Sequence, residues 1–543
     1  MKALNKGINN MTIEKIVIIF ICVACFSPSF ATNKKTVVHV TKVSVEIPDN
    51  PETVDPMIYG QMLEDCNDKI IYGGLLNEKN EENPAVFELL KSLQMPVVRW
   101  PAGTYIHEYD WENGIGPKEK RPVINCIRWG GVDTNLFGTD EFLQWCQRIG
   151  TEPYINFNMS NHPDYAASLG DALNWIEYVN GSSETAFGMK RIANGHADPY
   201  NVKYWCIGNE NYGSYGIHKA ETAEFYSHKL NQWASCFKSL YPDLSLLAVG
   251  HVYDWNKKVL EKNGNLIDFL TMHFYMGAKI KEGKLQDPLY TIFSPVKAEM
   301  QISKNAILFD KVNRLFDRID NPIRLSIDEW NCRHSVFENE KYSFTRNDTR
   351  RLFDVVTTAG MLNVFIRQSP YVGMANYIFP VNGHGLVRSV GDEDAYKSTI
   401  YHVFDLYRKH MSGEKMNIYI DGPKVTLPVQ ELAIGGNFDN ELLTEDVDVA
   451  YIDGVAVRTD DNVINLVLIN RSHLKKQEIK IEMPGGYVPV TMWKIENDDI
   501  NAGNSEDMRE HISPQMINLS RKHLNSKIII SPCGFILIQY KKG

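Results

Sequence analysis

The chain has 543 residues, which is too long for one ordinary domain. Its composition, 43% hydrophobic and 23% charged, is typical of a folded globular protein. Its formal net charge of −10 argues against nucleic acid as a partner, because no basic stripe is present to neutralise phosphates. The same charge weighs weakly against a polyanionic substrate such as pectate.

The first 31 residues predict a cleaved signal peptide. A lysine-bearing start precedes an apolar run at 16–26, and Ser29-Phe-Ala31 is a small-x-small cleavage site. The run is shorter than the ~20 residues that a membrane span needs, so we expect cleavage near Ala31, secretion to the periplasm or the medium, and no membrane span. A lipoprotein anchored at Cys25 is the alternative, disfavoured because Cys22 stands where a leucine is expected.

The remaining cysteines and the histidines predict neither a metal nor a cofactor. After removal of the signal peptide seven cysteines remain, and their spacing matches no metal motif. Buried free thiols are expected, with one disulfide as the alternative in an oxidising compartment. His251 and His273 end predicted strands, but a structural metal site needs more ligands than these. The seven are Cys66, Cys126, Cys146, Cys206, Cys236, Cys332 and Cys533.

The middle of the chain alternates short apolar strands with amphipathic helices such as 141–148 and 221–240, which predicts a parallel sheet of the α/β class. Eight such units favour a closed (β/α)8 TIM barrel over residues 51–410. An open doubly wound sheet is the alternative, disfavoured because no glycine-rich phosphate turn follows a strand. The predicted strands are 57–64, 96–100, 152–158, 204–210, 245–251, 269–275, 324–331 and 374–380.

Residues 411–543 change to a period-two pattern with turn signals between the runs, which predicts a C-terminal antiparallel β-sandwich domain. The stretch 36–47 alternates in the same way. We therefore expect residues 32–50 to contribute an N-terminal strand to that sandwich.

Polar side chains collect where the apolar runs of the barrel stop, and in TIM barrels that edge holds the active site. Two glutamates are bordered by aromatic and asparagine residues, Glu210 in Trp205-Cys-Ile-Gly-Asn-Glu-Asn211 and Glu329 in Ser326-Ile-Asp-Glu-Trp-Asn331. Glycoside cleavage uses such a pair, one carboxyl as acid and the other as nucleophile or base. The apolar approach to Glu210 suits an acid with a raised pKa, which leaves Glu329 as the nucleophile. Other strand ends carry Glu64, Arg99, His273 and Tyr275.

A series of motifs in this order resembles glycoside hydrolase family 51, the α-L-arabinofuranosidases. The motifs occupy residues 58–64, 98–103, 109–117, 134–142, 175–181, 208–213 and 328–331. The resemblance implies a retaining exo-glycosidase that removes terminal α-L-arabinofuranosyl residues from arabinan, arabinoxylan or derived oligosaccharides. Family members often form oligomers, so a homo-oligomer is one expectation.

The resemblance also implies roles for individual residues. Glu210 would be the general acid/base and Glu329 the nucleophile. Glu64, Asn209 and Tyr275 would contact the sugar, with Asn209 on its 2-hydroxyl and Tyr275 orienting the nucleophile. Arg99, Thr104, His273 and Trp129 complete the expected substrate-binding set.

The sequence departs from the family pattern at Thr104, where the family commonly has Asn, and at Phe379, where it often has Gln. Both departures bear on which sugar is recognised more than on the reaction. Trp100, Trp111 and Trp129 are candidates for the leaving-group side, and His384 for a loop that reaches the cleft.

Two other functions remain open. The first is an endo-β-1,4-glucanase or xylanase, or a furanosidase for another sugar, on the same barrel. An endo enzyme needs an open groove and an exo enzyme a closed pocket, which the loops 104–120 and 331–346 would decide. The second, a glycan-binding protein without catalysis, is disfavoured because both glutamate motifs are intact.

Overall fold

The computed structural model describes residues 40–65, 69–428, 445–523 and 526–543. The predicted signal peptide and Cys66 lie outside these ranges. Within them, no helix combines the length and the apolar character that crossing a bilayer requires.

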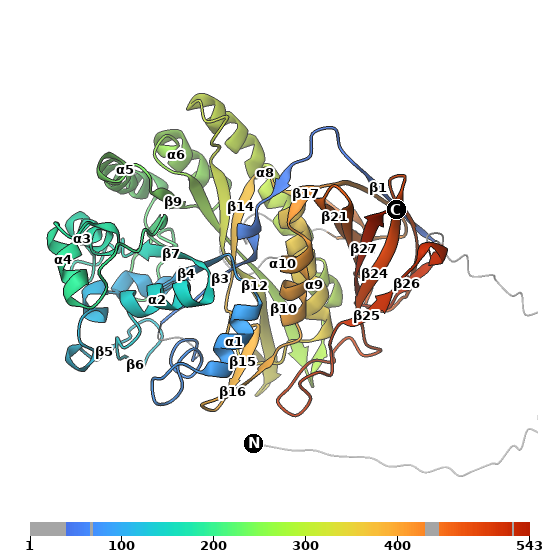
Figure 1. Ribbon diagram of the computed structural model, residues 1–543, viewed down its shortest axis with the longest axis horizontal. Helices are drawn as coiled ribbons and strands as arrows, with labels where there is room; N and C mark the ends of the chain where they lie inside the picture. The colour runs from blue at the N-terminus through green and yellow to red at the C-terminus, as the bar shows by residue number, and fades with distance from the viewer. Residues whose placement is uncertain (1–39, 66–68, 429–444, 524–525) are drawn as a thin grey trace, which may run out of the picture. The chain divides into compact units, whose positions relative to one another are not determined.

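Eight parallel strands close into a barrel, as predicted (Figure 1). Closure follows from the pairing of β10 with β12 on one side and with β9 on the other. The strands are β3 (Gly60–Met62), β4 (Val97–Trp100), β7 (Glu152–Phe157), β8 (Tyr204–Ile207), β9 (Ser245–Val249), β10 (Phe269–Lys281), β12 (Arg324–Glu338) and β14 (Val372–Tyr377).

The first predicted strand begins too early. Residues Pro56–Tyr59 form a 3-10 helix, η1, and β3 starts only at Gly60. Asp55 caps this turn by accepting a 3.1 Å hydrogen bond from the Met57 backbone N–H. An Asp followed by Pro at the first helical position is a helix-start signal, and it outweighs the apolar pattern here.

Helices follow the strands around the barrel. The α3 helix starts with reciprocal bonds between Ser168 and Asp171, a capping box. The α2 helix ends at Gly150, whose φ of 82° is left-handed. The helices are α1 (Pro84–Ser92), α2 (Thr139–Ile149), α3 (Leu169–Asn180), α4 (Ala186–Ala193), α5 (Ala223–Leu240), α6 (Tyr253–Asn263), α7 (Pro288–Ile292), α8 (Ser294–Leu315), α9 (Leu352–Arg367) and α10 (Tyr401–His410).

The C-terminal domain consists of two sheets of mostly antiparallel strands. The N-terminal strand β1 lies between β18, to which it runs antiparallel, and β23, to which it runs parallel. The four-stranded sheet has the order β18 (Asn417–Asp421), β1 (Thr41–Glu46), β23 (Gln477–Glu482) and β26 (Ile528–Ile530). The seven-stranded sheet has the order β2 (Thr53–Val54), β17 (Gly413–Lys415), β21 (Ile452–Asp460), β22 (Val463–Asn470), β27 (Phe535–Lys542), β24 (Tyr487–Ile495) and β25 (Gln515–Asn518).

Short hairpins decorate both domains. They comprise β5 (Ile124–Asn125) with β6 (Val132–Asp133), β11 (Lys284–Leu285) with β10, β13 (Lys341–Thr345) with β12, β15 (Val387–Val390) with β16 (Asp394–Lys397), and β19 (Lys424–Leu427) with β20 (Val447–Ala450).

A partly buried ion pair and aromatic packing join the barrel to the sandwich. Arg367 at the end of α9 lies 2.9 Å from Asp453 of β21 and makes two bonds, of 2.7 and 2.8 Å, to Glu299 of α8. The Tyr407 ring of α10 packs 6.1 Å from that of Phe535 in β27.

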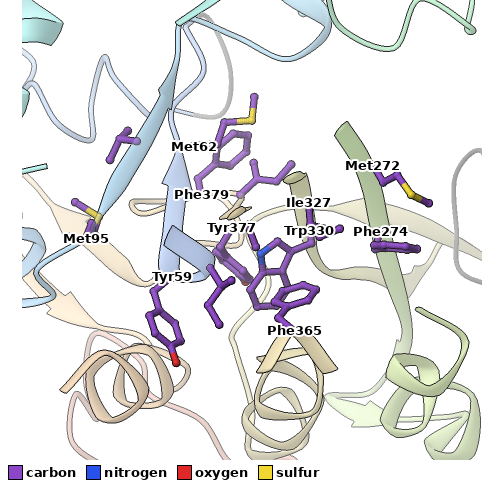
Figure 2. Packing of buried hydrophobic residues seen from close by; sticks show 14 of the residues in the cluster. Tyr59, Met62, Met95, Met272, Phe274, Ile327, Trp330, Phe365, Tyr377 and Phe379 are labelled. Atoms are coloured by element: carbon purple, nitrogen blue, oxygen red, sulfur yellow. The ribbon is translucent and has the colours of Figure 1, made fainter. Parts of the chain in front are cut away.

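Trp330 anchors the strand that carries Glu329 (Figure 2). Its ring is fully buried and meets Tyr377 at 5.0 Å and Phe365 of α9 at 5.2 Å, both edge to face. Because neighbouring residues of a strand point to opposite faces, this outward packing of Trp330 directs Glu329 into the barrel.

Candidate active site

A β-bulge in β12 shapes the catalytic end of the barrel. The pairing with β10 runs from Thr271 opposite Ser326 directly to His273 opposite Glu329, so two steps on β10 face three on β12. Bulges of this kind re-aim side chains next to active sites. Here both Asp328 and Glu329 reach the buried guanidinium of Arg99, at 3.6 and 2.9 Å respectively.

Glu329 is held by three groups that favour its charged form. Arg99 donates a 2.9 Å hydrogen bond to Oε1, the Tyr275 hydroxyl donates to Oε2, and His273 Nδ1 lies 3.6 Å from Oε2. Burial works to raise the pKa of the Glu329 carboxyl, but His273, Arg99 and the hydrogen bonds outweigh it and lower the pKa below its usual value. The site thus favours the ionised form of Glu329.

His273 bridges the two glutamates. Its Nδ1 lies 2.9 Å from Oε1 of Glu210, against 3.6 Å from Glu329. Burial works to lower the pKa of the imidazole, but the two carboxylates raise it above its ordinary value. Carboxylate oxygens of Glu210 and Glu329 and the histidine nitrogen all lie within 4.8 Å of one another. The two carboxyl groups therefore face each other across one imidazole.

Glu210 stands on a tight turn after β8. Gly208 has a φ of 97° and Glu210 itself a φ of 44°, a left-handed conformation that side chains rarely adopt. The Tyr212 hydroxyl donates a 3.1 Å hydrogen bond to Oε1 of Glu210. The Tyr212 ring stacks on His251 at 3.8 Å, which fixes the hydroxyl in place.

Arg99 also orients Asn209. Its Nη2 donates a 2.6 Å hydrogen bond to Oδ1 of Asn209, while the Asn209 Nδ2 is buried and has no partner among the described residues. A buried amide donor without a partner is costly unless a ligand satisfies it. The arrangement leaves the amide group of Asn209 available to donate to a ligand.

Glu64 and Gly103 form another part of the site, next to Glu329. The Gly103 N–H donates a 3.0 Å hydrogen bond to Oε1 of Glu64. A Cβ on Gly103 would lie 2.8 Å from Oε1 of Glu329 and 3.2 Å from Oε1 of Glu64. Only glycine permits the backbone to come so close to both carboxylates.

These residues enclose a cavity of about 120 Å³. Pockets for drug-sized ligands measure ~300–1,000 Å³, so this one holds a single small ring. It is lined by Glu64, Gly103, Thr104, Arg128, Trp129, Glu210, Tyr215, His273, Tyr275, Glu329, Asn331, Arg333, Arg346, Ile378 and Phe379.

Both departures from the family pattern line this cavity. The Thr104 hydroxyl accepts a 2.8 Å hydrogen bond from Nε of Arg128. Phe379 is 2% exposed and packs in the core near Met62 (Figure 2), offering the cavity an apolar edge. The Trp129 ring has the guanidinium of Arg128 at 4.3 Å and that of Arg346 at 4.9 Å.

Three other candidates lie elsewhere. Trp100 stacks on Phe142 in the core, and His384 is buried with its Nδ1 2.7 Å from Arg350; neither lines the catalytic cavity. Trp111 lines a second cavity of about 900 Å³. Ile127 lines that cavity and Arg128 the catalytic one, so a single loop forms the wall between them.

The sequence pattern did not identify Tyr212 or the three arginines of the cavity, Arg128, Arg333 and Arg346. Tyr212 stands two residues after Glu210 within the motif at 208–213, so its closeness to Glu210 could have been predicted from the sequence. Arg128 and Arg346 lie on loops, and Arg333 lies on the extension of β12 beyond the barrel. The hydrophobic periodicity of the sequence does not predict which residues of such segments reach the cavity.

Two groups of side chains have the composition of metal ligands, Glu210 with His273 and Glu329, and Cys332 with His334 and Asp354. Each already contains a guanidinium, from Arg99 in the first and from Arg350, 3.5 Å from Asp354, in the second. These guanidiniums supply the positive charge that a metal would bring. The six cysteines of the described ranges are free thiols, five of them buried.

The matching family models and the relatives named below are alpha-L-arabinofuranosidases. The alpha-L-arabinofuranosidase 1 domain model matches residues 89–293, and the alpha-L-arabinofuranosidase C-terminal domain model matches residues 328–530. A probable alpha-L-arabinofuranosidase C of Aspergillus niger is 31% identical over 80% of this chain and 86% of its own length. An intracellular exo-alpha-L-arabinofuranosidase of Bacteroides ovatus is 27% identical over 81% of this chain and 84% of its own. The thermostable GH51 alpha-L-arabinofuranosidase of Thermotoga petrophila has a TM-score of 0.78 at 26% identity, over 92% of this chain and 99% of its own.

Proposed function

The chain belongs to glycoside hydrolase family 51 and is a hydrolase of the α-L-arabinofuranosidase class; from this we propose that it removes terminal α-L-arabinofuranosyl residues with net retention of configuration. Glu329 is the proposed nucleophile and Glu210 the proposed acid/base. Arabinan, arabinoxylan and oligosaccharides derived from them are the proposed substrates.

The observation that carries retention is the closeness of the two carboxyl groups. Retaining enzymes place them ~5–5.5 Å apart, whereas inverting enzymes leave ~6.5–9.5 Å for a water molecule. Oxygens of Glu210 and Glu329 lie within 4.8 Å of each other, on either side of His273. This spacing is below the range that inverting enzymes use, and it supports direct attack by Glu329.

The proposed reaction has two displacements. Glu329 Oε attacks the anomeric carbon while Glu210 donates a proton to the leaving oxygen, which breaks the glycosidic bond and forms a glycosyl ester on Glu329. A water molecule then gives a proton to Glu210 and attacks the same carbon, releasing arabinose and the free carboxylate. Asn209 Nδ2 supplies the hydrogen bond to a ring hydroxyl that tightens in the transition state.

The size of the cavity favours exo action. A space of about 120 Å³ admits one sugar ring but not the several rings that an endo enzyme holds in a groove. The Bacteroides ovatus relative is itself described as an exo enzyme. An endo-glucanase or xylanase activity is accordingly not proposed.

Aryl glycosides with product stereochemistry followed by NMR test this function. We expect rapid cleavage of 4-nitrophenyl α-L-arabinofuranoside, no cleavage of the β-cellobioside, and α-L-arabinofuranose as the first-formed product. Preference for a galactofuranoside or a cellobioside would contradict the substrate, and a β-configured first product would contradict retention.

We also propose secretion after cleavage near Ala31, supported by the basic, apolar and small-residue order of residues 1–31. N-terminal sequencing of the protein recovered from its native host tests this. A mature N-terminus at about residue 32 is the expected result, and an intact Met1 in a cytosolic fraction would contradict it.

A further inference from the structure

Three arginine side chains surround the mouth of the catalytic cavity. Arg128, Arg333 and Arg346 all line it, and all three are partly exposed, whereas Glu210 and Glu329 are 7% and 6% exposed. The carboxylates thus form the floor of the cavity and the guanidiniums its rim. We call these three residues the arginine rim.

Aromatic rings hold two of these guanidiniums beside one tryptophan. Arg128 lies 4.3 Å from the Trp129 ring and 5.5 Å from the Tyr215 ring, and its Nε is bonded to Thr104. Arg346 lies 4.9 Å from the same Trp129 ring. A guanidinium stacked on a ring keeps its plane fixed while its N–H edge stays available for hydrogen bonds.

Arg333 also lies against aromatic rings. Its guanidinium lies 3.3 Å from the centre of the Tyr275 ring and 5.6 Å from that of Phe344. Tyr275 is the residue that contacts the nucleophile, so Arg333 stands directly above the catalytic floor. The rim is therefore built from ordered side chains.

Two of these charges lack a direct carboxylate partner among the described residues, although the Glu108 carboxylate acts on Arg128 at longer range. Among the described residues, none forms an ion pair with the guanidinium of Arg128 or Arg333, whereas the buried Arg99 pairs with both Asp328 and Glu329. In a chain with a net charge of −10, this local excess of positive charge at the rim is a specific feature. The positive charge at the rim would favour an acidic substrate at this site, although the overall negative charge of the chain weakly disfavours one.

Whatever is attached to the arabinofuranosyl ring must pass this rim, because the cavity holds only one ring. We propose that the arginine rim binds a carboxylate on the leaving group, so that the preferred substrates carry the arabinofuranosyl residue on or next to a uronic acid. The guanidinium fork matches a carboxylate with two parallel hydrogen bonds, which a neutral sugar hydroxyl does not. The inference rests on the proposed arabinofuranosidase function and specifies its substrate class.

A pair of matched probes tests this proposal: 4-carboxyphenyl and 4-carbamoylphenyl α-L-arabinofuranoside. The amide withdraws electrons more strongly and is the better leaving group, so chemistry alone favours it. We expect the carboxylate to be cleaved with a kcat/KM about tenfold higher or more at low salt, as charge-assisted hydrogen bonds allow. Added salt should reduce this ratio.

Substitution then assigns the preference to the rim. Arg128→Gln and Arg333→Gln should each bring the carboxylate-to-carboxamide ratio toward one, whatever they do to the absolute rates. Arg509→Gln is the matched control, because Arg509 pairs with Asp394 on the surface and does not line the cavity, and it should keep the wild-type ratio.

A ratio of one or less in the unsubstituted protein would overturn the proposal, and so would a higher ratio that survives both rim substitutions. Because the ratio is first measured without any substitution, a variant that fails to fold does not remove the test. Inactivity on these probes and on 4-nitrophenyl α-L-arabinofuranoside alike would instead overturn the proposed function, and this inference with it.

Discussion

Tyr212 donates a 3.1 Å hydrogen bond to Oε1 of Glu210, two residues before it on the same loop. Glu210 has a left-handed backbone with a φ of 44°, so its side chain depends on partners to keep one orientation. Tyr212 is itself fixed by stacking on His251 at 3.8 Å and by the edge of Trp255 at 5.8 Å. We infer that Tyr212 is a positioning residue for the proposed acid/base.

Tyr212→Phe keeps the stacked ring and removes only the hydroxyl. Since an ordinary hydrogen bond contributes ~0.5–1.5 kcal/mol, we expect kcat/KM on substrates with poor leaving groups to fall by up to about tenfold. Substrates with an activated leaving group such as 2,4-dinitrophenol, which need no protonation, should lose much less. Kinetics on both substrate types measure this.

Tyr226→Phe is the matched control, because its buried hydroxyl donates to the Ile207 carbonyl of β8 and accepts from the Val249 N–H, with no hydrogen bond to a carboxylate among the described residues. It should lower the Tm without distinguishing between the two leaving groups. Equal losses on both substrate types in Tyr212→Phe would contradict a role through Glu210.

Glu210→Ala extends the same reasoning to the proposed acid/base itself. General acid catalysis contributes ~10²–10⁴-fold, so arabino-oligosaccharides should lose about that factor in the glycosylation step, and activated aryl substrates far less. Glu329→Ala should lose nearly all activity on both. If Glu210→Ala and Glu329→Ala were equally inactive on the activated substrate, the division of roles would be wrong.

The barrel and its two glutamates could be predicted because each depends on local pattern. Eight apolar runs alternate with amphipathic helices, and strands run in one direction when helices connect them. Glu210 and Glu329 follow two of these runs, so parallel strands bring them to the same edge. The start of the first strand was wrong because the helix-start signal at Asp55-Pro56 was not recognised and residues 57–59 were assigned to the strand.

Contacts between segments that are distant in sequence could not be predicted. Arg128 reaches the cavity because Glu108 accepts the backbone N–H groups of Ile127 and Arg128, at 2.9 and 2.7 Å, and thereby shapes the loop. The bulge in β12 depends on its pairing with β10. The alternation of apolar and polar residues along the sequence reveals neither the contact of Glu108 with this loop nor the pairing of β12 with β10.

The pH profile should respond to His273. The imidazole is the first of the groups that lower the pKa of Glu329, ahead of Arg99, and it acts against the effect of burial. As the proposed nucleophile Glu329 must be ionised to attack, so the acid limb of kcat/KM should reflect its pKa in the free enzyme. In His273→Gln this pKa rises, and the acid limb should move to higher pH.

His251→Gln provides the control for that shift. Burial lowers the pKa of His251 to about 4, so the side chain is neutral where the enzyme works and its removal takes away no charge. The acid limb should stay in place even if the rate changes. An unmoved limb in His273→Gln would show that Arg99 and Tyr275 suffice to keep Glu329 ionised.

Gly103→Ala should damage catalysis more than folding. The added methyl group would lie 2.8 Å from Oε1 of Glu329, so one of the two must move. A displacement of ~1 Å in a catalytic group costs about 10²-fold, which is the expected loss in kcat/KM. Gly485→Ala, where a Cβ meets nothing within 4 Å, is the control and should leave kcat/KM unchanged. Wild-type kinetics in Gly103→Ala would contradict the close packing described.

Asp453→Asn should destabilise the junction between barrel and sandwich in a pH-dependent way. Burial works to raise the pKa of Asp453, but Arg367 and Arg471 outweigh it and lower the pKa below its ordinary value. A carboxyl with a depressed folded-state pKa contributes stability that is present above its unfolded pKa of ~3.9 and is lost as the pH falls through the folded value. At pH 7 the variant should therefore be less stable by about 1–3 kcal/mol. The loss stays within this range because Arg367 keeps its two hydrogen bonds to Glu299. Urea titrations at pH 7 and at about pH 3 measure the difference, which should shrink at the lower pH; a difference that is the same at both would mean that the charge of Asp453 does not hold the two domains together.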